Sequence, residues 1–217
     1  LEEGYGVQLS VISIKLLNKI GFKELEIDKK FTPEKINFYS NKSSNKICEL
    51  DITVFNTKEC KYTTLKRSTL INFLKKDLDD RIKTGYNISK INYQEKKIQI
   101  SFENNETEIC DYLIISDGVF SKSKSLISNN QNKPKYNDTL AIRGVLSKPP
   151  ENIDNKNISL FLGSDFHHVT YPINSNGALN LIAIMKYKLS TEEQKNYFLS
   201  NDNFFVKKVL KKIPLEN

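Results

Sequence analysis

The 217-residue sequence has no tryptophan and one methionine, and it is poor in glycine (8 residues), proline (6) and cysteine (3). So little glycine and proline excludes a collagen-like or low-complexity chain. The three cysteines, Cys48, Cys60 and Cys110, form no CxxC pair and fit no zinc module, so we expect no metal site and reduced, buried thiols. Hydrophobic residues make up 38% of the chain, which is enough for a core and excludes full disorder.

Long apolar runs are also missing. No stretch approaches the roughly 18 apolar residues of a transmembrane helix. The opening residues, LEEGYGVQLS, lack the basic and apolar regions of a signal peptide. We therefore expect no integral membrane segment and a cytoplasmic location. Because the sequence does not begin with Met, we expect a piece of a longer protein.

Arginine is scarce: only three of the 33 basic residues are arginines, and the formal net charge is +7. The chain has 24 Asn and 24 Ile but only 3 Ala, a bias that A/T-rich codons explain. Nucleic-acid-binding proteins tend to gather Lys and Arg on one face or tail, whereas these lysines are scattered, so we expect no nucleic-acid partner. A basic, non-enzymatic binding domain stays open as an alternative. It predicts nucleic-acid affinity that falls steeply with salt, which a gel shift would reveal.

The spacing of apolar residues predicts a mixed α/β fold. Helices are expected after the capping residues Ser10, Ser68, Ser190 and Asp202, and the second of them should run to Gly85. Expected strands lie at 36–40, 48–55, 87–94, 97–103, 109–116, 139–147, 158–162, 167–173 and 178–186. The polar stretch 128–137 is a candidate linker at which the chain crosses from one domain to the other.

The segment CDYLIISDGVFSKSK, residues 110–124, is the most informative part of the sequence. Its apolar run Tyr112–Ile115 suits a strand buried on both faces, and such a strand ends at a crevice where cofactors bind. Gly118 allows a close backbone approach to a ligand, and Asp117 can accept hydrogen bonds from a ribose. The alternative is that this Asp-Gly pair is simply a turn.

The strand HHVTYPI, residues 167–173, carries the residues best suited to act on a substrate. Side chains alternate along a strand, so His167 and Tyr171 face one side and His168 the other. A tyrosine can hydrogen-bond a phenol or carboxylate, and a histidine can accept a proton near neutral pH. The alternative is a buried, satisfied histidine beside a structural tyrosine.

Four segments, taken in chain order, resemble the class A flavoprotein monooxygenases. These are the single-component aromatic hydroxylases, including salicylate, hydroxybenzoate, hydroxynicotinate and ubiquinone-pathway hydroxylases. The matching positions are Gly4, Gly6, Val7, Gln8, Leu9, Ser10, Leu17 and Gly21; Arg67; Asp117, Gly118 and Ser121; and Gly163, His167, Val169, Tyr171, Pro172, Asn180 and Leu181. The departures are Tyr5, Val11, Ile115, Ser116 and Lys124.

The resemblance implies a partial FAD/NAD(P)-binding Rossmann-like domain with an inserted antiparallel-sheet substrate domain. The first would comprise residues 1–35 and 62–135, and the second 36–61 and 136–190. Helices in 191–217 would lead back toward the FAD-binding domain. The family's N-terminal GxGxxG unit and C-terminal Gly-Asp motif are not in the sequence, so we expect an internal fragment that binds FAD incompletely on its own.

The resemblance also implies the cofactor and the reaction. FAD is the cofactor and NAD(P)H the co-substrate; molecular oxygen forms a flavin C4a-hydroperoxide that hydroxylates a small phenolic substrate. Val7 and Gln8 would lie at the flavin ring, with Asp117 and Gly118 at the nucleotide. Arg67 would contact the pyrophosphate, as a guanidinium at a helix start can.

The same resemblance places His167 and Tyr171 in the substrate pocket. A reductase, epoxidase or halogenase on the same scaffold stays open, although the strand HHVTYPI favours a hydroxylase. The substrate and the choice between NADH and NADPH are not specified. A homodimer is left open, as is contact with a membrane surface if the substrate is a quinone precursor.

Overall fold

The computed structural model describes residues 5–128, 134–151, 153–195 and 202–213. Contacts between backbone positions divide the chain into two compact units, one made of residues 1–76 and 138–217 and the other of residues 77–137. None of the helices in the described ranges is long and apolar enough to cross a membrane. The assignment of 1–35 and 62–135 to a flavin-binding domain, and of 36–61 and 136–190 to a substrate domain, stays a prediction.

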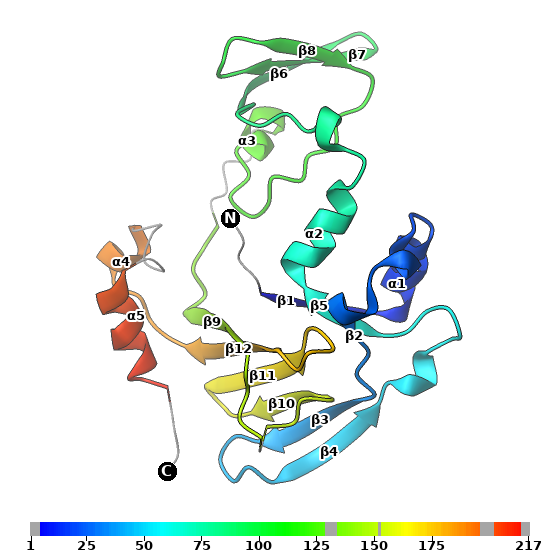
Figure 1. Cartoon of the computed structure of the whole chain (residues 1–217). Helices are drawn as coiled ribbons and strands as arrows, with labels where there is room; N and C mark the ends of the chain where they lie inside the picture. Colours follow the sequence, from blue (N-terminus) through cyan, green and yellow to red (C-terminus); the bar gives the residue numbers. More distant parts are fainter. Residues whose placement is uncertain (1–4, 129–133, 152, 196–201, 214–217) are drawn as a thin grey trace. The chain divides into compact units, whose positions relative to one another are not determined.

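A six-stranded sheet forms the centre of the first unit (Figure 1). In sheet order its strands are β4 (Lys46–Asp51), β3 (Lys35–Ser40), β10 (Ile158–Leu162), β11 (Phe166–Pro172), β12 (Leu179–Lys186) and β9 (Thr139–Leu146). All neighbouring strands are antiparallel except β3 and β10. The mixed α/β fold with antiparallel sheets is thus confirmed, and the strands predicted over 139–147, 158–162, 167–173 and 178–186 correspond to β9 to β12.

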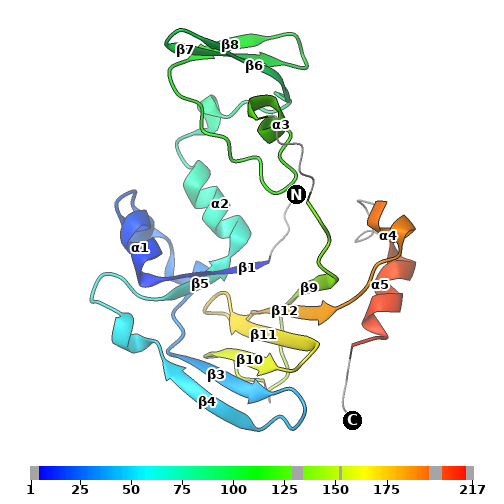
Figure 2. The ribbon, with the colours of Figure 1, turned by 180° about the vertical axis from the view of Figure 1, so that it is seen from behind.

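A second, three-stranded sheet belongs to the same unit and has the order β1 (Gly6–Leu9), β5 (Thr63–Lys66) and β2 (Lys30–Phe31). Helices α1 (Val11–Asn18) and α2 (Arg67–Lys75) pack on it (Figure 2). Ser10 caps α1 by accepting a hydrogen bond from the Ser13 N–H, as predicted. The core between α1, α2 and this sheet is formed by Ile14, Phe22, Cys60 and Leu65.

Two hydrogen bonds join β1 and β5 to the large sheet. The Gly6 N–H donates to Asn180 Oδ1 at 2.6 Å, and the Thr64 hydroxyl donates to the Pro172 carbonyl. Asn180 and Thr64 are both fully buried. Because a buried N–H must find a partner, these bonds fix β1 against the large sheet.

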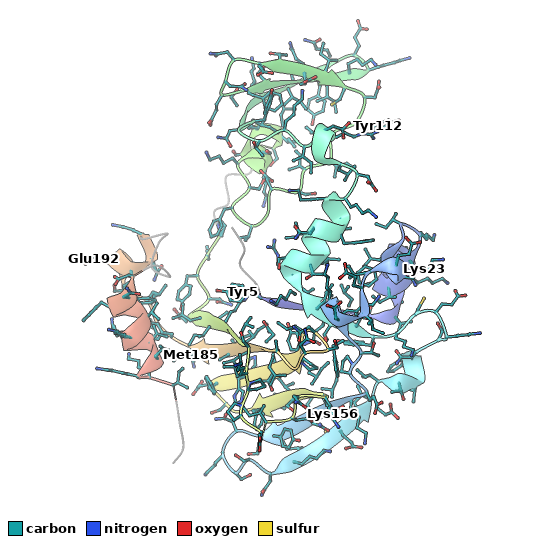
Figure 3. The ribbon with its side chains drawn as sticks, viewed as in Figure 1. Tyr5, Lys23, Tyr112, Lys156, Met185 and Glu192 are labelled. Carbon is teal, nitrogen blue, oxygen red and sulfur yellow. The ribbon has the colours of Figure 1, made fainter. Side chains whose placement is uncertain are left out.

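The second unit is built on the antiparallel sheet β6 (Ile88–Gln94), β7 (Lys97–Phe102) and β8 (Thr107–Cys110), with the short helix α3 (Ser123–Ile127). The predicted buried strand over 109–116 is wrong beyond Cys110. Tyr112, labelled in Figure 3, and Ile114 are each 89% exposed. A strand buried on both faces needs a partner on each side, and residues 111–116 pair with no strand of the described chain.

Helix starts were predicted better than helix ends. Ser190 and Glu193 form the expected capping box before α4 (Thr191–Lys195), and Asp202 caps α5 (Asn203–Leu210). By contrast, Lys66 rather than Ser68 occupies the N-cap of α2, and this helix ends at Lys75 instead of reaching Gly85.

Two further expectations are corrected. The strand predicted over 48–55 ends at Asp51, and a 3₁₀ turn, η3 (Thr53–Phe55), follows it. The cysteines are free, but Cys48 is exposed on β4 rather than buried, because β4 is an edge strand whose side chains all reach solvent.

Candidate functional site

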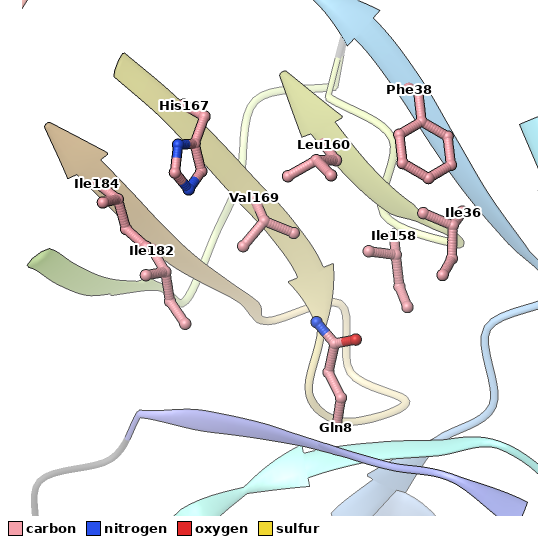
Figure 4. Close-up of a pocket in the computed structure, with 9 residues that line it drawn as sticks. All are labelled: Gln8, Ile36, Phe38, Ile158, Leu160, His167, Val169, Ile182 and Ile184. Atoms are coloured by element: carbon pink, nitrogen blue, oxygen red, sulfur yellow. The ribbon is translucent and has the colours of Figure 1, made fainter. Parts of the chain in front are cut away.

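A pocket of about 350 Å³ lies where the large sheet faces β1. Figure 4 shows Gln8 reaching into it from β1, with His167 at its other end. The lining residues are Gln8, Ile36, Phe38, Ile158, Leu160, His167, Val169, Ile182 and Ile184. Seven of these nine are apolar. A concave, mostly apolar pocket of this size with two polar groups suits a small aromatic ligand.

The strand register explains why these side chains meet. One row across the sheet aligns Leu160, Val169 and Ile182, and the next aligns Leu162, His167 and Ile184. Cross-strand neighbours in such rows point to the same face with their Cβ atoms about 5 Å apart. The pocket wall is therefore built from alternate residues of β10, β11 and β12.

Gln8 is held in place by a hydrogen bond from Tyr62. The Tyr62 hydroxyl donates a hydrogen bond to Gln8 Oε1 at 2.7 Å, and Gln8 also interacts with the Tyr171 hydroxyl. In Figure 4 the amide oxygen points toward Ile158 and the amide nitrogen toward the Val169 side of the pocket. The side chain thus offers a fixed donor to a bound ligand.

Tyr171 shares a face of β11 with His167 but is only 1% exposed and is not one of the pocket-lining residues. Gly6 of β1 covers its ring: a Cβ added at Gly6 would lie 2.7 Å from Tyr171 Cε2. Burial raises the pKa of Tyr171 to about 12, and the positive charge of Arg143 partly opposes this. The phenol therefore stays protonated at neutral pH.

This pKa predicts an alkaline loss of stability. The folded state keeps its proton on Tyr171 between pH 10 and 12 while the unfolded chain releases it, so the free energy of unfolding is highest below pH 10 and falls as the pH rises through 12. The loss attributable to Tyr171 should be on the order of 2 kcal/mol. Urea unfolding at pH 9 and pH 11 tests this: Tyr171→Phe should lose less stability than the unmodified chain. Equal losses in both proteins would contradict it.

The two neighbouring histidines occupy opposite faces of the sheet. His167 lines the pocket, whereas His168 stacks on Phe161 with ring centroids 4.4 Å apart. Burial lowers the pKa of His168, and the adjacent His167 lowers it further. Among the described residues, His168 Nδ1 is buried without a hydrogen-bond partner. His168 is therefore a packing residue, and His167 is the imidazole available to a ligand.

Arg67 and Val7 occupy the same unit as the pocket but do not line it. Arg67 is exposed at the first position of α2, and its backbone N–H donates to the Tyr5 carbonyl at 2.6 Å. Val7 points away from Gln8 into the core around Leu65. The alternation along β1 accounts for this opposite orientation.

Asp117 and Gly118 lie in the second unit, in an irregular loop before α3. Asp117 Oδ2 accepts a hydrogen bond from the Ser123 N–H at 3.1 Å. Hydrogen bonds from Ser121 and Ser123 lower the pKa of this carboxyl group. Gly118 has φ +81° and open space around it. The loop is thus a glycine turn whose aspartate is already engaged within the loop.

Sequence reasoning did not single out Tyr62, and it gave no role to the apolar wall of Ile158, Ile182 and Ile184. The alternation of β10 and β12 contained a signal for the wall, since these residues share one face of their strands. Nothing local marks Tyr62, because its partner Gln8 is 54 residues away in the sequence.

The chain was compared with known proteins in sequence and in structure. No protein-family model matches the sequence. Over 138 residues, 57% of the chain, it is 25% identical to a salicylate hydroxylase of Pseudomonas putida, and the match covers 32% of that protein. A 2,6-dihydroxypyridine-3-hydroxylase from Arthrobacter nicotinovorans matches in structure with a TM-score of 0.68 and 16% identity, over 87% of this chain and 48% of that chain. HpxO of Klebsiella pneumoniae, solved with FAD and uric acid, matches in structure with a TM-score of 0.72 and 13% identity. This match covers 96% of this chain and 56% of the HpxO chain.

The chain therefore has the fold of FAD-dependent hydroxylases, and the predicted resemblance is confirmed. In sequence, the similarity is to salicylate hydroxylase in particular. The chain spans about a third of this curated relative and about half of the two solved structures.

Several features of the chain fit a flavin nucleotide. The open space around Gly118 allows a ligand to approach the backbone closely. The Arg67 guanidinium is exposed and forms no ion pair within the described part of the chain, so it can bind a phosphate. As the edge strand of its sheet, β1 leaves backbone donors and acceptors free beside Gln8.

Proposed function

We propose that this chain forms the substrate pocket and part of the flavin site of an FAD-dependent monooxygenase that hydroxylates a phenolic compound. The observation that carries the proposal is the apolar pocket with Gln8 and His167 at its two ends. The reaction consumes one NAD(P)H, one proton and one O₂, and yields the hydroxylated ring, NAD(P)⁺ and water. When bound, FAD supplies the redox chemistry, accepting electrons from NAD(P)H and activating oxygen.

The pocket residues bind and orient the ring. Val169, Ile182 and Leu160 provide an apolar wall that excludes water from its face. The Gln8 amide, fixed by Tyr62, donates to a polar substituent at one end. A pre-oriented donor selects one orientation of the ligand, which fixes the ring carbon that is presented for hydroxylation.

His167 acts on the substrate hydroxyl. It is the only titratable side chain among the lining residues. By accepting the phenolic proton it makes the ring more electron-rich and hence more reactive toward oxygen transfer. Tyr171, covered by Gly6, supports the site by holding Gln8 rather than by touching the ring.

Arg67, Val7, Gln8, Asp117 and Gly118 are the residues that we assign to the cofactor. Arg67 would bind the pyrophosphate, and the β1 backbone at Val7 and Gln8 would lie beside the flavin ring. Asp117 and Gly118 would contact the nucleotide.

Turnover of phenolic acids tests the function. We expect the protein, expressed from its complete reading frame with FAD, to oxidise NADH or NADPH faster when a hydroxylatable phenol is added. The oxidised nicotinamide and the hydroxylated product should form in similar amounts. Stimulated oxidation with no hydroxylated product would favour a reductase on this scaffold, and no stimulation by any phenol would contradict the proposal.

A further inference from the structure

The turn between β11 and β12 contains Asn176, which is the only one of the chain's 24 asparagines that is followed by glycine. Asn176 is exposed, and Gly177 has φ +84° with no atom within 4 Å of an added Cβ. A glycine in this left-handed conformation is typical of a tight hairpin turn. Open space therefore surrounds the peptide bond that follows the Asn176 side chain.

The backbone N–H groups on either side of Gly177 are engaged. The Ser175 N–H donates to the Asp28 carbonyl at 3.4 Å. The Ala178 N–H donates to a side-chain oxygen of the turn at 3.0 Å. Within the described part of the chain, by contrast, the Gly177 N–H makes no hydrogen bond. This nitrogen can reach the amide carbon of the Asn176 side chain in a five-membered ring, and such proximity within one molecule favours reaction.

Two other exposed asparagines in loops lack this arrangement. Asn105 is followed by Glu106, whose N–H donates to a side-chain amide oxygen at 3.0 Å. Asn155 is followed by Lys156, whose N–H donates to an aspartate oxygen at 2.9 Å. At both places the following nitrogen is engaged and its residue carries a long side chain, so ring closure must break a hydrogen bond and is hindered.

We propose that Asn176 is a site of spontaneous deamidation in the folded protein. The Gly177 nitrogen forms a bond to the side-chain amide carbon of Asn176, which closes a succinimide ring. The bond from that carbon to the side-chain nitrogen breaks, and this nitrogen leaves as ammonia with the proton that Gly177 loses. One water molecule then opens the ring at either carbonyl and leaves aspartate or isoaspartate. Each product carries one new negative charge, and neither requires the proposed function.

Isoaspartate is expected to disturb the strands that follow the turn. It adds one methylene group to the main chain inside a turn that is closed by the hydrogen bond from the Ile173 N–H to the Ala178 carbonyl, at 3.0 Å. Ile173 and Leu179, at the two ends of the turn, are fully buried. Because turn length fixes the register of a hairpin, a longer turn must displace one of these strand ends.

Peptide mapping by mass spectrometry tests the proposal. The protein expressed from its complete reading frame would be incubated at mildly alkaline pH, both folded and unfolded in urea. We expect the Asn176 peptide of the folded protein to deamidate within about tenfold of its rate in urea, because an open turn adds less than about 1.4 kcal/mol to the barrier. The peptides that contain Asn105 and Asn155 should react more slowly in the folded protein than in urea, and more slowly than Asn176.

Asn176→Gln should abolish this reaction, since a glutamine side chain would need to close a six-membered ring. Asn155→Gln is the matched control and should leave the reaction at Asn176 unchanged. If Asn176 reacts in urea but stays intact in the folded protein, or if Asn105 or Asn155 reacts faster when folded, the inference is wrong.

The consequence for the turn is tested on the separated products. The isoaspartate form should unfold at a lower urea concentration than Asn176→Asp, which carries the same charge on a backbone of normal length. Equal midpoints of unfolding would contradict the expected displacement of the strand ends.

Discussion

Replacing Gly6 with alanine is expected to destabilise the first unit by about 3 kcal/mol, which is a large share of the stability of a typical domain. A Cβ at this position would lie 2.7 Å from Ile173 Cγ2, 2.7 Å from Tyr171 Cε2 and 2.8 Å from Asn180 Cβ. These three neighbours are at most 1% exposed, so they have no room to move aside. Relief requires β1 to shift away from the large sheet, which breaks the hydrogen bond from the Gly6 N–H to Asn180.

The same shift should displace Gln8 from the pocket. Gly6→Ala is therefore expected to lower both the midpoint of urea unfolding and the affinity for a pocket ligand. Gly144→Ala is the matched control, since Gly144 lies in β9 with no atom within 4 Å of an added Cβ. A Gly6→Ala protein as stable as Gly144→Ala would show that β1 does not pack on the sheet as described.

Replacing His167 with asparagine is expected to lower kcat/KM for a phenolic acid about 100-fold, as is typical when a general base is lost. The side chain lines the pocket, and asparagine keeps its approximate shape but cannot accept the phenolic proton. NAD(P)H oxidation should continue in this variant while less hydroxylated product forms, because the defect lies in substrate activation. Measuring product and oxidised nicotinamide in the same reaction separates these two effects.

His168→Asn provides the control from the adjacent position. His168 stacks on Phe161 on the opposite face, so its replacement should reduce stability without changing kcat/KM or the yield of product. The assignment of His167 would be wrong if the two variants lost activity equally, or if His167→Asn kept full coupling and an unchanged KM.

The sequence predicted those parts of the fold that depend on local pattern. The strands predicted over 139–147, 158–162, 167–173 and 178–186 correspond to β9 to β12, and alternation along β11 placed His167 on one face and His168 on the other. Capping residues located the starts of α1, α4 and α5 because each makes its hydrogen bonds within a few residues of the chain.

The predictions failed where the outcome depends on distant partners. The run Tyr112–Ile115 has the composition of a buried strand, but composition does not reveal whether a neighbouring strand is available. The apolar stripe after Arg67 continues to Ile82, yet Asp77 adopts φ +67° just after the helix has ended. A left-handed residue is incompatible with a continuing helix, and nothing in the periodicity marks it.

The candidate site shows the same limit. Alternation put His167 and Tyr171 on one face, but only the packing of Gly6, far away in the sequence, buries Tyr171 and leaves His167 open to the pocket. Likewise, Tyr62 is brought to Gln8 because β5, which directly follows Tyr62, pairs with β1. Contacts of this range have no local signature.

We propose above all that the pocket serves an oxygen-inserting flavoenzyme. The most direct test supplies ¹⁸O₂ to the protein expressed from its complete reading frame, together with FAD, NADH or NADPH, and salicylate or another phenolic acid. Mass spectrometry of the aromatic product should show one ¹⁸O atom, with no label acquired from H₂¹⁸O in the reciprocal experiment. An unlabelled product, or NAD(P)H oxidation that reduces the substrate without adding oxygen, would contradict the account.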